Sequence, residues 1–224
     1  RKADAILFYS NDPIKQYLSE GFRREKLHVA NNTVLVNDIK TNLKRETILF
    51  IGTLYKQKKI YELLNSYFEA NKENSEVPNL EIIGDGAEFD NISGWIKSNG
   101  LENNIFLRGK IFDEDILSNY FSAAIACISP GQAGLSVLKS MGYGVPYITK
   151  EKAITGGEIF NIKNNVSGIL YDNDNQLKDI ILEITTNTQK YLELGIEAKK
   201  HYDEFRKPKD MADGICEAIE FVSK

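Results

Sequence analysis

The stretch AIACISPGQAGLSVLKSMGYGVPYIT, residues 124–149, decides the fold. It begins with the apolar run Ala124–Ile128, continues through a glycine-containing turn into a segment with apolar residues at helical spacing, and ends in the apolar run Pro146–Thr149. A strand, a helix and a second strand in this order are typical of parallel strands joined by a crossover helix.

The same alternation extends along most of the chain. The other predicted strands are Ala5–Tyr9, Ile48–Ile51, Leu80–Ile83, Ile105–Leu107 and Gly168–Leu170. They are almost continuously apolar, as strands are when helices cover both faces of their sheet. The clearest predicted helix covers residues 60–70, where one face carries Ile60, Leu63, Leu64, Tyr67 and Phe68. The sequence therefore predicts an α/β fold, a Rossmann-like parallel sheet with helices on both faces.

Residues 30–46 interrupt this pattern. They are rich in Asn, Thr and charged residues, which predicts a linker between domains. A compact domain is expected over residues 47–185, followed by helices over 187–205 and from Pro208 onward. The last helix is expected to bury Met211, Ile215, Ala218, Ile219 and Val222. Because the chain begins at Arg1 and enters a buried strand almost at once, we expect it to start partway through a longer protein.

Composition excludes several classes of function. The chain of 224 residues has a formal net charge of -4, which does not favour a nucleic-acid partner. Cys127 and Cys216 lack metal-ligand spacing, so a buried free thiol in a reducing, cytoplasmic compartment is expected. Neither His28 nor His201 belongs to a metal-binding pattern, and we expect no metal site. No apolar run approaches the roughly 18 residues that a membrane span needs, and no signal peptide is evident.

Ligands of open parallel sheets bind outside the carboxyl ends of the strands, so the residues after each strand are candidates. Gly52-Thr53 and the lysines Lys56, Lys58 and Lys59 follow the strand Ile48–Ile51. Glycine allows close approach of a ligand, and lysine beside a helix start can neutralise phosphate. A simple turn with exposed lysines remains the alternative.

Two further strand ends carry weaker signals. Gly84-Asp85-Gly86 follows Leu80–Ile83 and could place backbone donors near a ligand or form a plain tight turn. The next strand, Ile105–Leu107, is followed by the candidates Arg108, Gly109, Lys110 and Ile111. These residues bring two cations to the same edge of the sheet, or form an ordinary loop.

The helix inside the deciding stretch carries the most informative candidates. Its apolar residues Leu135, Leu138 and Met141 are expected to face the sheet. The candidates at its start are Pro130, Gly131, Gly134 and Leu135. Unpaired backbone N–H groups there would suit a diphosphate, although such glycines also serve packing or turns.

The same helix carries polar residues at i, i+3 and i+4. Ser136, Lys139 and Ser140 are therefore expected to lie together on a second face. The last candidate is Glu158, in the glycine-rich loop after the strand Pro146–Thr149, where it could hold a sugar hydroxyl or be an exposed loop acid. No Ser-His-Asp or Cys-His triad can be assembled, and no G-x-G-x-x-G supports a standard NAD site.

The order of these motifs resembles the C-terminal domain of glycosyltransferase family four, the GT-B group also called glycosyl transferases group 1. The motifs are ILFIGTLYKQKK, LEIIGDG, NIFLRGKI, SPGQAGLSVLKSMGYGVPYIT, GGEIF and NVSGILY, and together they cover residues 47–185. By the same resemblance, residues 1–30 match the end of the N-terminal acceptor domain, 31–46 the hinge, and 186–224 the closing helices.

The resemblance implies transfer of a sugar, with retention at the anomeric carbon, from a nucleotide-diphosphate sugar to a hydroxyl of a saccharide or lipid-linked acceptor. It implies no cofactor and no divalent metal, since the nucleotide sugar is a substrate. Lys58 and Gly52 match family positions at the diphosphate, and Arg108–Ile111 match the nucleobase region. Thr53 stands where the family usually has arginine, a loss for which Lys56 or Arg108 could compensate.

A second departure concerns two glutamates that many family members carry. The matching positions are Gly131 and Lys139, so the usual ribose contact does not carry over. A subgroup with P-G-x-x-G-L at this place resembles the chain more closely and occurs among enzymes that build bacterial capsule or lipopolysaccharide. Glu158 matches the glutamate of a Pro-Glu pair, with Gly157 in place of proline.

These matches imply mainly electrostatic roles. Lys58 and the helix start at Gly134–Ser136 would stabilise the departing diphosphate, and Glu158 would orient the donor sugar. The acceptor, and any peripheral contact with the inner face of the membrane, would belong to the N-terminal domain, so this chain alone is expected to bind donor weakly and turn nothing over. Two alternatives stay open, a GT-B nucleotide-sugar epimerase and a non-catalytic domain that binds sugar nucleotides. Nucleoside diphosphate release that requires acceptor would indicate the transferase.

Overall fold

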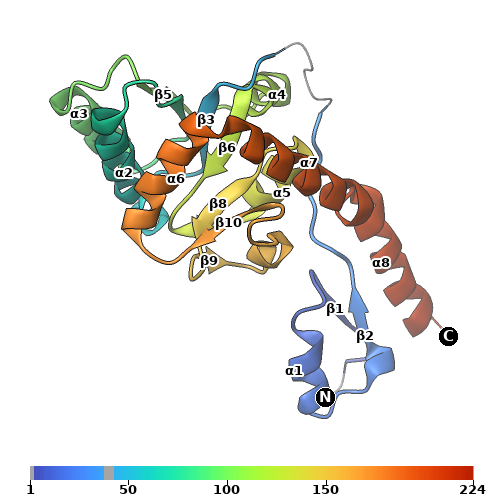
Figure 1. The fold of residues 1–224 in the computed structure, drawn as a ribbon. Helices are drawn as coiled ribbons and strands as arrows, with labels where there is room; N and C mark the ends of the chain where they lie inside the picture. The colour runs from blue at the N-terminus through green and yellow to red at the C-terminus, as the bar shows by residue number, and fades with distance from the viewer. Residues whose placement is uncertain (1–2, 38–42, 224) are drawn as a thin grey trace.

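The computed structural model describes residues 3–37 and 43–223, and its centre is a six-stranded parallel sheet (Figure 1). The strand order is β10-β8-β6-β3-β4-β5, and every neighbouring pair is parallel. The strands are β3 (Thr47–Ile51), β4 (Asn79–Ile83), β5 (Ile105–Gly109), β6 (Ala124–Ile128), β8 (Tyr147–Lys150) and β10 (Gly168–Tyr171). The predicted fold class is confirmed, and each predicted strand of the sheet is present.

The strand order places a switch point between β3 and β6. From β3 the chain adds β4 and β5 on one side, and then returns to add β6, β8 and β10 on the other. The connections therefore leave the carboxyl ends of β3 and β6 in opposite directions and open a crevice between them, where ligands of such sheets bind.

Helices cover both faces of the sheet, because successive residues of a strand point to opposite sides. Ile48 and Phe50 pack with α2 (Ile60–Glu73), α3 (Phe89–Ser98) and α6 (Asp174–Thr186). Leu49 faces the other way, into a second core that includes the fully buried Cys127. The helices of that core are α4 (Glu114–Ala123), α5 (Leu135–Gly142) and α7 (Thr188–Phe205). The predicted free thiol at Cys127 is buried, and burial raises its pKa to about 12.

The N-terminal segment forms a small unit with its own core. The strands β1 (Ile6–Phe8) and β2 (Leu27–Val29) pair in parallel, joined through α1 (Ile14–Ser19) and the short helix η1 (Arg24–Lys26). Phe8, Ile14 and Leu27 form the core of the unit. The sequence predicted β1 but not β2, which has only three residues and includes a histidine. The C-terminal helix α8 (Pro208–Val222) runs beside both strands (Figure 1).

The face that α8 buries differs from the predicted one. Ala218 is buried, but Ile219 and Val222 are 56% and 49% exposed, so their predicted burial is wrong. The helix instead presents Gly214 and Ala218 to the N-terminal unit. The small residues allow the closest approach of the helix to β2, which leaves Ile219 and Val222 facing outward, whereas Met211 and Ile215 are half-buried.

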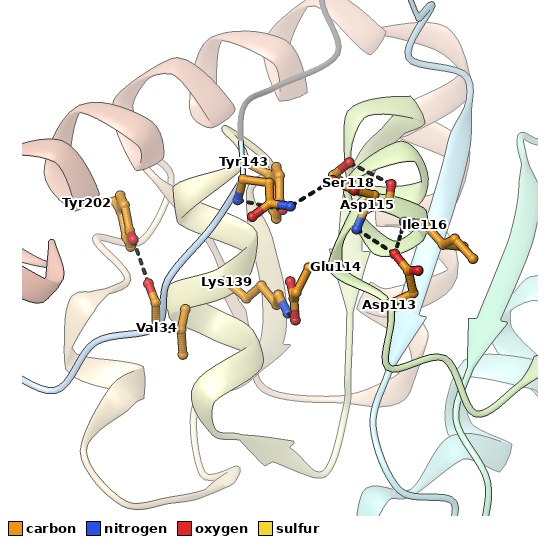
Figure 2. Close-up of polar contacts among 10 residues, drawn as sticks. Val34, Asp113, Glu114, Asp115, Ile116, Ser118, Lys139, Tyr143 and Tyr202 are labelled. Atoms are coloured by element: carbon orange, nitrogen blue, oxygen red, sulfur yellow. Dashed lines mark hydrogen bonds and ion pairs between the residues drawn. The ribbon is translucent and has the colours of Figure 1, made fainter.

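The predicted linker has no helix or strand in its described parts, residues 30–37 and 43–46, and residues 38–42 lie outside the described residues. It is nevertheless fixed to the sheet domain. Tyr202 donates a hydrogen bond to the Val34 carbonyl at 2.5 Å, and the Asn37 amide donates to the Tyr143 hydroxyl at 3.0 Å (Figure 2). The domain limits predicted from the sequence (1–30, 31–46, 47–185 and 186–224) stay a prediction; residues 1–2 and 224 are also outside the described part.

Candidate functional site

The crevice between β3 and β6 is closed at one side by two loops that touch. After β3 the chain forms the short helix η2 (Lys56–Lys58), and after β6 it passes through Pro130 and Gly131. The Gly131 amide donates to the Lys58 carbonyl at 3.1 Å. A Cβ atom at Gly131 would lie 2.1 Å from the Gln57 carbonyl oxygen, so no side chain fits there. Gly131 is buried under η2 and serves as the contact that joins the two loops.

Lys58 is the most unusual side chain of this crevice. It is 7% exposed, and burial lowers the pKa of its ammonium group. Its Nζ lies beside the backbone of Gly52, at 3.0 Å from the position that a Cβ of that residue would take. Among the described residues no carboxylate forms an ion pair with Lys58. A buried cation without an acidic partner costs several kcal/mol, and an anionic ligand would offset this cost.

A pocket of about 430 Å³ extends from Gly52 across the ends of β3, β4 and β5. The residues that line it all follow these strands or end them: Ile51, Gly52, Thr53, Ile83, Gly84, Asp85, Gly86, Lys110, Ile111 and Phe112. Hydrogen bonds from Gly52 to Ile83 and from Gly84 to Gly109 hold the three strand ends together. The structure thus unites the predicted candidates from three separate motifs.

The wall at the end of β5 carries an aromatic ring and a cation. Phe112, which the sequence analysis did not single out, is 76% exposed and faces this pocket. The Lys110 ammonium lies 4.4 Å from the centre of its ring. The available sequence signal was an aromatic residue three positions after the glycine that ends the strand. Such a ring offers a stacking surface for a planar base.

Arg108 does not reach this pocket, contrary to the prediction. Its side chain leaves β5 on the other side and binds Glu81 of β4 through two hydrogen bonds, of 2.6 Å and 3.0 Å. β5 ends at Gly109, whose φ of +72° turns the chain before Lys110, so the Arg108 and Lys110 side chains line different pockets. Lys56 is also directed elsewhere, since it lines a separate pocket beyond η2. Neither side chain lines the pocket that contains Thr53.

The start of α5 is open to solvent. Gly134 caps the helix without a side chain, Leu135 is 50% exposed, and nothing lies within 4 Å of a Cβ built at Gly134. The first N–H groups of the helix are therefore accessible to a ligand. The Ser136 hydroxyl is already engaged, since it lies 2.9 Å from the Tyr147 hydroxyl.

The prediction that Ser136, Lys139 and Ser140 lie together on one face of α5 is wrong. Ser140 is fully buried and donates to the Val145 carbonyl at 2.9 Å. The Lys139 ammonium contacts Glu114 of α4 at 2.5 Å, as Figure 2 shows. Ser136, Lys139 and Ser140 thus contact three different partners, because α5 packs against α7, η3 and β8 and is open to solvent at its start.

Glu158 begins the short helix η3 (Glu158–Asn161) and is only 9% exposed, so it is not an exposed loop acid. Its carboxylate accepts hydrogen bonds from the Gly156 amide at 3.0 Å and from the Asn32 side chain at 2.9 Å. Asn32 was not predicted from the sequence, because an asparagine in an Asn-rich linker carries no signal of a partner 126 residues away. The pair joins the linker to the loop after β8.

Within residues 3–37 and 43–223 no group of three or more His, Cys, Asp or Glu residues is arranged to hold a metal ion. No helix in the same residues has the length and apolar character that crossing a membrane requires.

Known proteins resemble this chain in sequence and in fold. The poly(ribitol-phosphate) alpha-N-acetylglucosaminyltransferase of Staphylococcus aureus is 25% identical over 183 residues, which are 80% of this chain and 36% of that protein. A crystal structure of a TarM point mutant from S. aureus, in complex with fondaparinux, alpha-GlcNAc-glycerol and UDP, superposes with a TM-score of 0.79 at 22% identity, covering 97% of this chain and 44% of that one.

A third match is the pneumococcal O-GlcNAc transferase GtfA in complex with UDP and GlcNAc, with a TM-score of 0.76 at 19% identity, covering all of this chain and 46% of that one. The chain therefore spans less than half the length of each of these three proteins. The model of the family described as glycosyl transferases group 1 matches residues 32–201. Since the match includes both loops of the crevice and the pocket beside them, the chain belongs to the glycosyl transferases group 1 family.

Proposed function

We propose that this chain is the donor-binding part of a retaining glycosyltransferase that moves a sugar from a uridine-diphosphate sugar to a hydroxyl of a saccharide or lipid-linked acceptor. The observation that carries the proposal is the buried, unpaired Lys58 ammonium beside Gly52, next to a pocket of about 430 Å³. Uridine is proposed because TarM and GtfA were both crystallised with UDP.

The proposed chemistry follows from where negative charge develops. As the bond from the anomeric carbon to the diphosphate breaks, the diphosphate gains charge. Lys58 and the open start of α5 lie on either side of the crevice and would stabilise that charge. The base would stack on Phe112, and Glu158 would orient the sugar. The nucleotide sugar is a substrate in this scheme, and Lys58 supplies positive charge beside the diphosphate.

A role in bacterial surface polysaccharide synthesis is part of the proposal. Its support is the S. aureus relative, which is named for transfer to poly(ribitol-phosphate). The two departures at Gly131 and Lys139 also fit a catalytic domain. Gly131 serves the contact of two loops, and Lys139 is held by Glu114, so neither position is vacant in the fold.

The first test is calorimetric titration of the chain with UDP, GDP, dTDP and CDP. We expect UDP to bind and Lys58→Ala to weaken it about tenfold to a hundredfold, because a charge-assisted contact contributes about 1.5–3 kcal/mol. Lys178→Ala is the matched control. The Lys178 ammonium lies away from the crevice and pairs with the Glu73 carboxylate at 2.8 Å. A folded sample that binds none of the four, or a Lys58→Ala variant that binds UDP as well as the original chain, would contradict the proposal.

A further inference from the structure

A second pocket lies on the other flank of η2 and is lined by lysines. Its volume is about 440 Å³, and it shares no lining residue with the pocket next to Gly52. The residues that line it are Lys56, Gln57, Lys59, Pro130, Gly131, Lys150, Lys152, Ala153 and Ile154. Four of these nine are cations and none is an acid, in a chain whose formal net charge is -4. The pocket thus concentrates positive charge, although the chain as a whole has a negative net charge.

One acid beside the pocket compensates part of that charge. Glu62 lies at the start of α2, where one of its oxygens contacts the Lys150 ammonium at 2.6 Å and the other lies 3.5 Å from that of Lys59. One carboxylate therefore serves two lysines. Lys56 and Lys152 form no ion pair with any residue in the described ranges, and both are exposed. The pocket keeps an excess of positive charge that an anion can neutralise.

The backbone holds the walls of this pocket in fixed positions. Gly131 donates to the Lys58 carbonyl at 3.1 Å and accepts from the Ile154 amide at 3.0 Å, so one residue joins η2 to the loop after β8. That loop turns sharply, with the Ala153 amide donating to the Lys150 carbonyl at 3.0 Å. The short strands β7 (Gln132–Ala133) and β9 (Ile154–Thr155) pair just beyond it. The lysines thus project from a rigid frame, which reduces the entropy lost when a ligand binds.

The shape and chemistry of the pocket fit a phosphate group. Lysine ammonium groups bind phosphate as point charges from several directions, without the planar geometry that arginine requires. The volume exceeds what a phosphate ion needs and leaves room for a small polyol or sugar attached to it. The Gln57 amide could bind hydroxyls of such a group, and Ile154, which is 56% exposed, offers an apolar edge.

We propose that the pocket formed by Lys56, Lys59, Lys150 and Lys152 is a second anion site, separate from the proposed donor site, that binds the phosphate group of a phosphate ester or free phosphate. The proposal does not depend on the proposed function, since the two pockets have no residue in common. The phosphate group could come from a phosphorylated acceptor or from inorganic phosphate.

The test is titration of the chain with inorganic phosphate and, separately, with glycerol 3-phosphate, followed by NMR of the backbone amides. We expect saturable shifts centred on Gln57, Gly131 and Lys152 that persist at physiological salt. The Lys56→Gln, Lys152→Gln double variant should bind about tenfold more weakly, because two of the cations are lost. Tighter binding of glycerol 3-phosphate would identify an ester as the source, and equal affinity would identify free phosphate.

A matched control removes the same charge elsewhere. Lys72 and Lys200 are exposed and lie on α2 and α7, away from the pocket, and the Lys72→Gln, Lys200→Gln double variant should bind phosphate as the original chain does. The proposal is overturned by absence of saturable binding, by unchanged affinity in the pocket variant, or by equal losses in both double variants. It is also overturned if Lys58→Ala removes phosphate binding. UDP titration of the pocket variant tests the donor site independently, and unchanged UDP affinity is expected.

Discussion

Arg108 shows at the scale of a residue how the alternation of a strand decides which side chains can meet. Its guanidinium group binds Glu81, which is 7% exposed, and this contact raises the pKa of Arg108. Arg108→Ala would leave the Glu81 carboxylate buried without its partner. We expect a loss of about 1–3 kcal/mol in the free energy of unfolding, less than for a fully buried pair because Arg108 is partly in water. Urea denaturation measures the loss.

The same variant separates the two interpretations of Arg108. Because the side chain points away from the pocket that contains Gly52, UDP affinity of Arg108→Ala should equal that of the original chain at temperatures where both are folded. A large loss of UDP affinity with unchanged stability would mean that Arg108 contacts the ligand directly.

His201 is a second residue whose surroundings set a measurable property. Burial, and then the positive charges of Arg206 and Lys163, lower its pKa from 6.5 to about 4. Between these two values the unfolded chain binds a proton that the folded chain does not, so this histidine makes stability fall as the pH drops from about 6.5 to about 4. The expected loss is about 1–2 kcal/mol, reduced from the full effect because the ring is only partly buried.

The pH dependence can be assigned with one variant. His201→Gln has no titrating group at this position, and we expect urea midpoints of the variant to change less between pH 6.5 and pH 4 than those of the original chain. If both proteins lose the same stability over this interval, the acid sensitivity comes from other groups.

At the scale of elements, periodicity predicted the sheet because its signal is local. Each strand from Ile48 to Leu170 is an apolar run, and each carries its apolar character in consecutive residues. The strand β2, Leu27–Val29, was missed because it consists of only three residues, one of them histidine. The face of α8 was misplaced for a related reason. Its sequence contains two overlapping apolar stripes, and only the position of β2 selects the one through Gly214 and Ala218.

In the candidate site, too, features with a local sequence signal were predicted and features that depend on distant partners were not. Residues placed at strand ends by the backbone, such as Gly52, Gly84 and Lys110, were predicted from sequence and lie together. Partners separated by long stretches of chain, such as Asn32 with Glu158, were not, because no local pattern encodes which loops meet. Those contacts depend on packing of the whole domain, which a single sequence does not display.

At the scale of the whole molecule, the described residues form two packed units of unequal size. The sheet is packed on both faces, whereas the unit of β1 and β2 has the small core of Phe8, Ile14 and Leu27 and rests on α8. Opening of the small unit exposes far less apolar surface than opening of the sheet. Amides in β1 and β2 should therefore exchange with solvent through a local opening, and those in β6 only through global unfolding.

Two glycine-to-alanine variants test this division. A Cβ at Gly214 of α8 would lie 2.2 Å from the Val29 carbonyl oxygen, whereas a Cβ at Gly94 of α3 meets nothing within 4 Å. Alanine favours a helix over glycine by about 1 kcal/mol at either position, so only Gly214→Ala should loosen the contact with β2. By hydrogen exchange we expect Gly214→Ala to speed the Phe8 and Val29 amides about tenfold or more without a comparable change in β6. Gly94→Ala should leave Phe8 and Val29 unchanged. If β6 amides accelerate in step with those of β2, the sheet and the N-terminal unit open as one cooperative unit and the division is wrong.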